Sequence, residues 1–101
     1  FINTSAWEGS PTAVWEALAY GLPVVTTDVG SIDYYVGKLK AGLVSRVGDH
    51  KGLSQNIIKF INSYELRKEF GLRAIFIAKK FLNVERCAKL HNIHYKKMLE
   101  K

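Results

Sequence analysis

The sequence predicts an α/β domain built from short parallel strands followed by C-terminal helices. Two short and largely apolar segments, Leu22–Thr27 and Gly42–Arg46, have the composition of buried parallel strands. A helical segment precedes the first of them, and alternation of strands with helices implies right-handed crossovers in a parallel sheet. After Asp49, apolar residues recur at helical spacing. The 101 residues are enough for one small domain.

The first half of the chain predicts strands around one helix. Phe1–Ser5 has the pattern of the end of a buried strand that runs into a loop. Ser10 is a favoured N-cap residue and Pro11 a favoured first helical residue, so we expect a helix over Pro11–Tyr20 that Gly21 ends. The elements expected after it are a strand over Leu22–Thr27, a loop over Gly30–Ala41 with a helical turn near Ile32–Val36, and a strand over Gly42–Arg46.

The second half predicts three helices. Asp49 is a cap candidate for the first, and Asn83 for the last, which should extend to about Leu99. Gly71 lies inside the middle helix, Tyr64–Phe81, where it indicates a bend. The residues expected to face inward are Leu53, Ile57, Ile58 and Ile61 on the first helix, Leu66, Phe70, Ala74, Ile77 and Phe81 on the second, and Val84, Cys87, Ala88, His91 and Met98 on the last.

The composition, 48% hydrophobic and 24% charged, is typical of a soluble globular protein. The apolar run Ala17–Val25 is too short and too interrupted by Gly and Pro to span a bilayer, and no signal peptide is evident. The single cysteine, Cys87, excludes an internal disulfide and fits a reducing compartment, so we expect a cytoplasmic protein. Because the chain starts at Phe1 without an initiator Met, we expect a fragment of a larger protein.

The formal net charge of +6 is concentrated in the last third of the chain. One interpretation is a solvated helix face; another is a surface for an acidic partner or for the inner face of a membrane, which a peripheral protein would contact. A nucleic-acid partner is not expected, because no aromatic residues are interleaved with the basic ones and no recognised motif is present.

The helix start in the first half predicts an anion site. The amides of Thr12 and Ala13 have no intrahelical partner, and with the helix dipole they can hold a phosphate. Glu16 lies roughly 7.5 Å farther along the axis and leans back toward Thr12. That spacing matches the distance from phosphate to ribose in a nucleotide, and a carboxylate can accept from both hydroxyls of a ribose. The alternative is that Glu8 and Glu16 are ordinary exposed residues.

A family resemblance accompanies this pattern. The matching residues are Glu8–Gly9, Pro11, Glu16–Ala17, Gly21–Leu22–Pro23–Val24–Val25 and Asp28–Val29–Gly30. With seven residues between its glutamates, the segment resembles the E-x7-E donor-binding motif of retaining GT-B glycosyltransferases of the group 1 or family 4 type. Weaker matches, which extend the resemblance over nearly the whole chain, are Gly42–Leu43–Val44, Gly48–Asp49 and Glu65–Leu66–Arg67 with Gly71.

The resemblance implies a partial Rossmann-like domain of a GT-B fold, in which residues 1–101 form the C-terminal portion of the donor-binding domain and the acceptor domain is absent from this chain. It implies a hexosyltransferase-type enzyme of polysaccharide or glycoconjugate biosynthesis that transfers a glycosyl group, with retention, from a nucleotide-diphosphate sugar to a saccharide or lipid-linked acceptor. No metal or other cofactor is expected, because no His, Cys or carboxylate spacing suggests a metal site.

The same resemblance implies roles for individual residues. Glu8 would contact hydroxyls of the donor sugar near the reacting centre, which makes it the catalytic candidate, although no residue is an evident covalent nucleophile. The donor-binding candidates are Gly9, Ser10, Thr12, Ala13 and Glu16, with the amides around Ser10–Ala13 on the diphosphate and Glu16 on the ribose. The helix start would then stabilise the departing nucleoside diphosphate.

The sequence departs from the family at one loop. The family commonly has a second Gly after Gly30 and then a Pro-Glu pair, where this chain has Ser31 and Asp33–Tyr34. The family's basic pair for the pyrophosphate, its base-binding loop and its acceptor domain would lie upstream of Phe1, so this chain alone should bind donor weakly and be inactive. The alternative function is a non-catalytic module that docks on a membrane or a partner through its basic helical tail.

Overall fold

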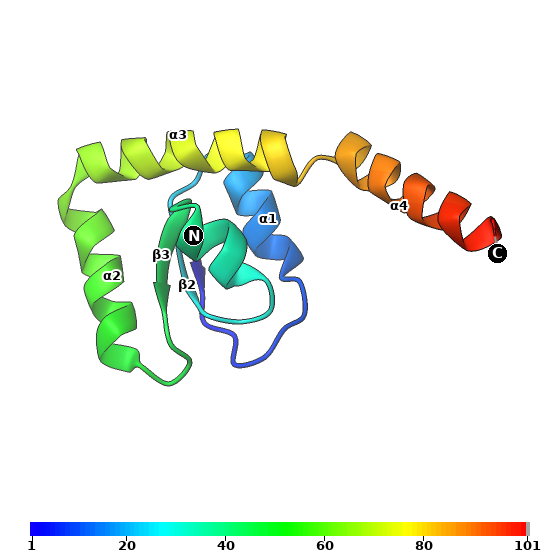
Figure 1. Ribbon diagram of the computed structural model, residues 1–101. Helices are drawn as coiled ribbons and strands as arrows, with labels where there is room; N and C mark the ends of the chain where they lie inside the picture. Colours follow the sequence, from blue (N-terminus) through cyan, green and yellow to red (C-terminus); the bar gives the residue numbers. More distant parts are fainter. Residues whose placement is uncertain (101) are drawn as a thin grey trace.

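The computed structural model describes residues 1–100. Within them the sheet has three parallel strands in the order β1-β2-β3. The elements are, in chain order, β1 (Ile2–Asn3), α1 (Thr12–Ala19), β2 (Val24–Thr27), the π-helix η1 (Asp33–Lys38), β3 (Gly42–Ser45), α2 (His50–Asn62), α3 (Tyr64–Phe81) and α4 (Val84–Leu99). The predicted α/β order of short parallel strands followed by helices is confirmed (Figure 1).

The central strand β2 is the most deeply buried element, since all four of its residues, Val24–Thr27, are buried. Its neighbour β1 lies at the edge, where Phe1 is 44% and Ile2 is 51% exposed. The prediction of a buried strand over Phe1–Ser5 is therefore wrong for these residues. The reason is that β1 pairs with β2 on one side only within the described part of the chain.

Two hydrophobic clusters hold helices against the sheet. The larger joins α1, η1 and α3 to β2, and the smaller joins α2 and α3 to β2 and β3. Figure 1 shows α3 crossing the molecule from α2 to α1, and α3 packs against both. Leu18 and Val14 of α1 and Ile32 and Val36 around η1 are fully buried in the larger cluster.

Helix α3 runs without interruption through Gly71, so the expected bend there is wrong. Gly71 is buried against the turn after α1, and a Cβ at this position would lie 2.6 Å from the backbone oxygen of Gly21. The glycine therefore permits close contact between α3 and the α1–β2 turn. Gly21 itself has φ +73°, a left-handed conformation that ends α1 as predicted.

Helix α2 turns a different face inward from the one predicted. Phe60 is 6% exposed and packs edge-on against Phe70, with ring centroids 5.2 Å apart. Ile58 and Ile61 are 52% and 67% exposed, so the prediction that they face inward is wrong. The buried stripe follows Leu53, Ile57 and Phe60 because that spacing of four and then three residues keeps to one helical face.

Helix α4 begins as predicted, since the Asn83 side chain accepts a hydrogen bond from the Arg86 amide at 2.6 Å. Its predicted buried side is wrong: Cys87, Ala88, His91 and Met98 are all exposed, and the predicted burial of Val84 lies outside the described residues. The reason is that α4 projects from the body of the molecule (Figure 1). The radius of gyration of 15.4 Å accordingly exceeds the roughly 13 Å of a compact domain of this length.

Candidate functional site

The segment Glu8–Glu16 occupies the loop between β1 and α1 and the first turns of that helix. The loop leaves the carboxyl end of β1, beside the carboxyl end of β2. Ligands of open α/β sheets bind outside the carboxyl ends of the strands. The position of the segment therefore suits a binding site.

The start of α1 differs in detail from the prediction. Pro11 occupies the N-cap position with an extended backbone (φ −72°, ψ 95°), and no side chain caps the helix. Ser10 is not the N-cap, since it lies one residue earlier and its hydroxyl accepts from the Trp15 indole at 2.8 Å. The Ser10 oxygen that was expected to cap the helix is engaged by the Trp15 indole instead.

This arrangement leaves the first amides of α1 open. The carbonyl of Pro11 accepts from the amides of Val14 and Trp15, at 3.0 and 3.3 Å. The amides of Thr12 and Ala13 form no hydrogen bond with any other group in residues 1–100. Two unpaired donors at the positive end of a helix dipole can accept an anion.

The remaining candidate donor-binding residues lie on the surface around this helix start. Gly9, Ser10, Thr12, Ala13 and Glu16 are all exposed. Glu16 follows Thr12 by four residues, which places the two on one face of α1. A ligand held by the amides of Thr12 and Ala13 could therefore extend along the helix to the Glu16 carboxylate.

Glu8 has a different environment from Glu16. It is half-buried, and its Oε2 accepts a hydrogen bond from the Asn3 side chain at 3.4 Å. Asn3 lies on β1, and the sequence interpretation did not include it among the site residues. Asn3 pairs in register with Thr26 of β2, and only that register brings the side chains of Asn3 and Thr26 together. The only signal in the sequence was a polar residue at the end of an apolar strand.

The backbone at Glu8 and Gly9 is packed against the loop after β2. Gly30 has φ +55°, and a Cβ there would lie 2.0 Å from the carbonyl oxygen of Gly9 and 2.7 Å from that of Glu8. Only a residue without a side chain allows this approach. The glycine of the Asp28–Val29–Gly30 match thus holds the loop that carries Glu8.

The aromatic residues near the segment pack with one another. Tyr35 contacts Trp15 edge-on at 5.6 Å between ring centroids and lies 6.2 Å from Phe81. Trp15 therefore packs against η1, at the side of the larger cluster that also contains Phe81. Tyr34 is 51% and Trp7 is 87% exposed, so both are free to meet a ligand or another surface.

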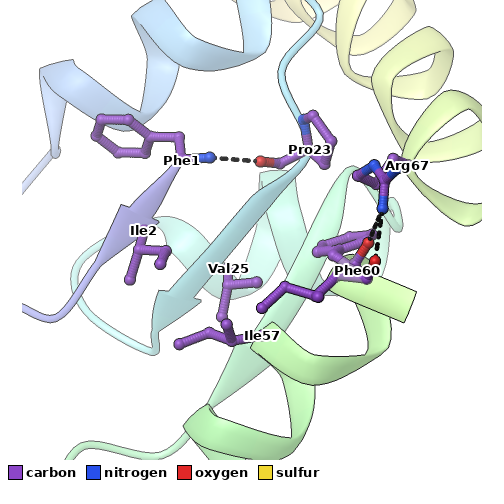
Figure 2. Close-up of a pocket in the computed structure, with 8 residues that line it drawn as sticks. Phe1, Ile2, Pro23, Val25, Ile57, Phe60 and Arg67 are labelled. Carbon is purple, nitrogen blue, oxygen red and sulfur yellow. Dashed lines mark hydrogen bonds between the residues drawn. The ribbon is translucent and has the colours of Figure 1, made fainter. Parts of the chain in front are cut away.

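Neither glutamate lines any of the three described cavities. One of them, of about 470 Å³, has a mainly apolar lining and lies near the amino ends of β1 and β2 (Figure 2). Beside it the Phe1 amino group donates to the Pro23 carbonyl at 2.8 Å, and partial burial lowers the pKa of that amino group. Arg67 donates to the carbonyls of Phe60 and Ile61 at the end of α2.

The described residues, 1–100, contain neither a metal site nor a membrane span. No group of three or more His, Cys, Asp or Glu side chains is placed to hold a metal ion. None of the described helices combines the length and the apolar character that crossing a bilayer requires.

Comparison with known proteins identifies relatives of this chain. The family model described as glycosyl transferases group 1 matches residues 1–75. The structure of sucrose-phosphate synthase from Thermosynechococcus elongatus superimposes with a TM-score of 0.88 over 98% of this chain, at 21% sequence identity. This chain spans 25% of that protein's length. No match was found among curated proteins. The expected partial Rossmann-like domain of a GT-B fold is thus confirmed.

Proposed function

Because the chain belongs to the group 1 glycosyltransferases, we propose that its Glu8–Glu16 segment binds the nucleotide-diphosphate sugar donor of a glycosyl transfer reaction. The observation that carries this proposal is the open start of α1, where the amides of Thr12 and Ala13 lack partners and Glu16 is exposed one turn along. The amides would hold the diphosphate and Glu16 the ribose hydroxyls.

Glu8 would face the sugar at the other end of the diphosphate. A half-buried carboxylate with one oxygen held by Asn3 can accept hydrogen bonds from sugar hydroxyls without being freely solvated. The sugar's anomeric carbon would then lie close to Glu8, and the leaving phosphate close to the amides of α1.

The chemistry we propose is electrostatic. As the bond between the anomeric carbon and the phosphate oxygen breaks, negative charge grows on the departing diphosphate, where unpaired helix amides and the helix dipole stabilise it. Transfer would proceed with retention and with no resident metal. The acceptor would be a saccharide or a lipid-linked sugar of polysaccharide or glycoconjugate biosynthesis.

This chain would supply only part of the active site. The E-x7-E segment contains no basic residue to grip the pyrophosphate, and the matched structure is about four times as long as this chain. We therefore propose that residues 1–101 are the C-terminal portion of a donor-binding domain, which by itself binds donor weakly and is inactive.

Calorimetric titration of the complete protein with UDP-glucose, GDP-mannose and ADP-glucose tests the proposal. One of these donors should bind to the wild type. Glu16→Ala should weaken the binding of that donor at least about tenfold, because a hydrogen bond to a charged group contributes about 1.5–3 kcal/mol. Glu65→Ala, an exposed glutamate near the start of α3, is the matched control and should leave affinity unchanged. Absence of binding to all three donors, or equal loss in both variants, would contradict the proposal.

The second candidate function is docking of α4 on an anionic membrane from the cytoplasmic side. It is favoured by one observation: α4 exposes large apolar side chains together with basic ones, among them Leu90, Ile93, Met98, Lys89, Lys96 and Lys97. Sedimentation with phosphatidylserine vesicles tests it. Binding that disappears when residues 84–101 are removed supports docking, and equal recovery with neutral vesicles contradicts it.

A further inference from the structure

The side chain of Asn3 connects the carboxylate of Glu8 to the interior of the sheet. Its Nδ2 donates to Glu8 Oε2 at 3.4 Å and to Thr26 Oγ1 at 3.2 Å. Its Oδ1 accepts from the hydroxyl of Ser5 at 3.1 Å. Both ends of the amide are therefore engaged, and the amide orientation is fixed, because a flipped amide would turn an oxygen toward the Glu8 carboxylate.

The far end of this connection is anchored in the core. Thr26 is fully buried, and its hydroxyl donates to the Thr27 carbonyl at 3.0 Å. Thr27 is 5% exposed and donates through its own hydroxyl to the Ser5 carbonyl at 2.6 Å. These bonds tie the end of β1 to the end of β2, so Asn3 is held by a rigid part of the fold.

Glu8 has no competing partner. In residues 1–100, Asn3 is the only donor to its carboxylate, and the two described ion pairs, Lys38–Asp33 and Arg73–Glu69, leave it out. Oε2 is thus held by the protein, whereas Oε1 has no hydrogen bond to the described chain. The held oxygen fixes the direction in which the other can accept.

We propose that Asn3 is a positioning residue that orients the Glu8 carboxylate toward the hydroxyls of the donor sugar, an inference that rests on the proposed function of Glu8. Holding one oxygen removes rotamer freedom that sugar binding would otherwise have to remove. Asn3 acts on the sugar through Glu8 and has no role at the nucleotide, which the amides and the carboxylate of α1 would bind.

Two ligands separate this role from a general structural one. The complete protein is titrated with the donor that binds among UDP-glucose, GDP-mannose and ADP-glucose, and with the corresponding nucleoside diphosphate without sugar. Asn3→Ala should weaken binding of the nucleotide sugar about fivefold to tenfold and change the affinity for the nucleoside diphosphate by no more than about twofold. Thr26→Val, which removes the anchor and leaves Glu8 untouched, should act in the same direction with a smaller loss.

A second comparison tests the dependence on Glu8. In a Glu8→Gln background the charged acceptor is gone, so adding Asn3→Ala should weaken the nucleotide sugar by less than about twofold. Asn62→Ala, an exposed asparagine at the end of α2, is the control and should change neither ligand.

The outcomes distinguish failure of this inference from failure of the proposed function. If the wild-type protein binds none of the donors, the proposed function is wrong and the role of Asn3 falls with it. If the wild type binds a donor but Asn3→Ala weakens sugar nucleotide and nucleoside diphosphate equally, Asn3 is structural only. The same conclusion follows if its effect is unchanged in the Glu8→Gln background.

Discussion

Among single residues, Gly30 is subject to the strictest steric requirement near the candidate site. It combines a left-handed backbone, φ +55°, with contact to the backbone of Glu8 and Gly9. Gly48 has a similar φ of +87° but open space where a Cβ would be. An added side chain would be strained by the left-handed backbone at both positions, but it would meet neighbouring atoms only at Gly30. Comparing the two positions therefore separates these two effects on the free energy of unfolding.

Gly30→Ala should destabilise the chain by about 2 kcal/mol more than Gly48→Ala. A left-handed alanine costs about 1–2 kcal/mol at either position, and overpacking against a backbone adds about 1–3 kcal/mol at Gly30 alone. Urea unfolding of both variants measures the difference. Equal losses would show that the loop after β2 does not hold the Glu8 loop.

Sequence reasoning at the residue scale identified Glu8 and Glu16 but could not assign their surroundings. Both are glutamates near one helix start, yet Glu16 is exposed and Glu8 is half-buried against Asn3. The sequence does not encode this difference, because the Glu8 loop lies against Gly30 of the loop after β2 and Asn3 is held by Thr26 of β2, and both partners come from distant segments.

At the scale of elements, the contact between α1 and α3 organises the fold around the site. The buried side of α3 lies on the turn that ends α1, with Gly71 against the Gly21 carbonyl. This contact fixes α1, and hence the direction in which its first amides point. The free energy of unfolding of a Gly71 variant therefore measures how strongly this contact holds α1 in place.

Gly71→Ala should destabilise the chain by about 1–2 kcal/mol, although alanine is the better helix former by about 1 kcal/mol. The added Cβ would lie 2.6 Å from the Gly21 oxygen, so α3 must move away from α1. Thermal unfolding should show a melting temperature lower by several degrees. Ser54→Ala, at an exposed position of α2, is the control, and a Gly71→Ala variant more stable than wild type would refute the contact.

Element order was predictable because strand and helix periodicities are local, whereas the choice of inward faces was not. Helix α2 buries Phe60 and exposes Ile61, although both are apolar and adjacent. The choice depends on Phe70, which comes from α3 and packs edge-on against Phe60. Similarly, the cap of α4 by Asn83 was predictable, because it depends on residue type alone. Burial of one face of α4 was not, because it depends on a surface for that face to pack against, and the described chain offers none.

At the scale of the whole molecule, α4 is set apart from the folded body. Arg86 connects α4 to the end of α3, since it donates to the Phe81 carbonyl at 2.8 Å and lies over the Phe81 ring. Residues 87–100 are all exposed, and a helix that packs so little is marginally stable by itself in water. It should therefore contribute little to the stability of the rest.

Removing residues 84–101 should lower the melting temperature of this chain by no more than about 3 °C, because residues 85–100 are exposed apart from the half-buried Arg86. Hydrogen exchange should also be faster in α4 than in the buried stretch of α3 around Ala74. Loss of cooperative unfolding after the truncation would show instead that α4 is part of the core.

In the proposed site, the start of α1 holds a diphosphate and Glu16 holds the ribose. The most direct test titrates the complete protein with the nucleoside diphosphate of the best donor and with its 2′-deoxy analogue, for wild type and Glu16→Ala. The missing hydroxyl should weaken binding to the wild type about tenfold and to Glu16→Ala less than twofold. An equal loss in both proteins, or none in the wild type, would contradict it.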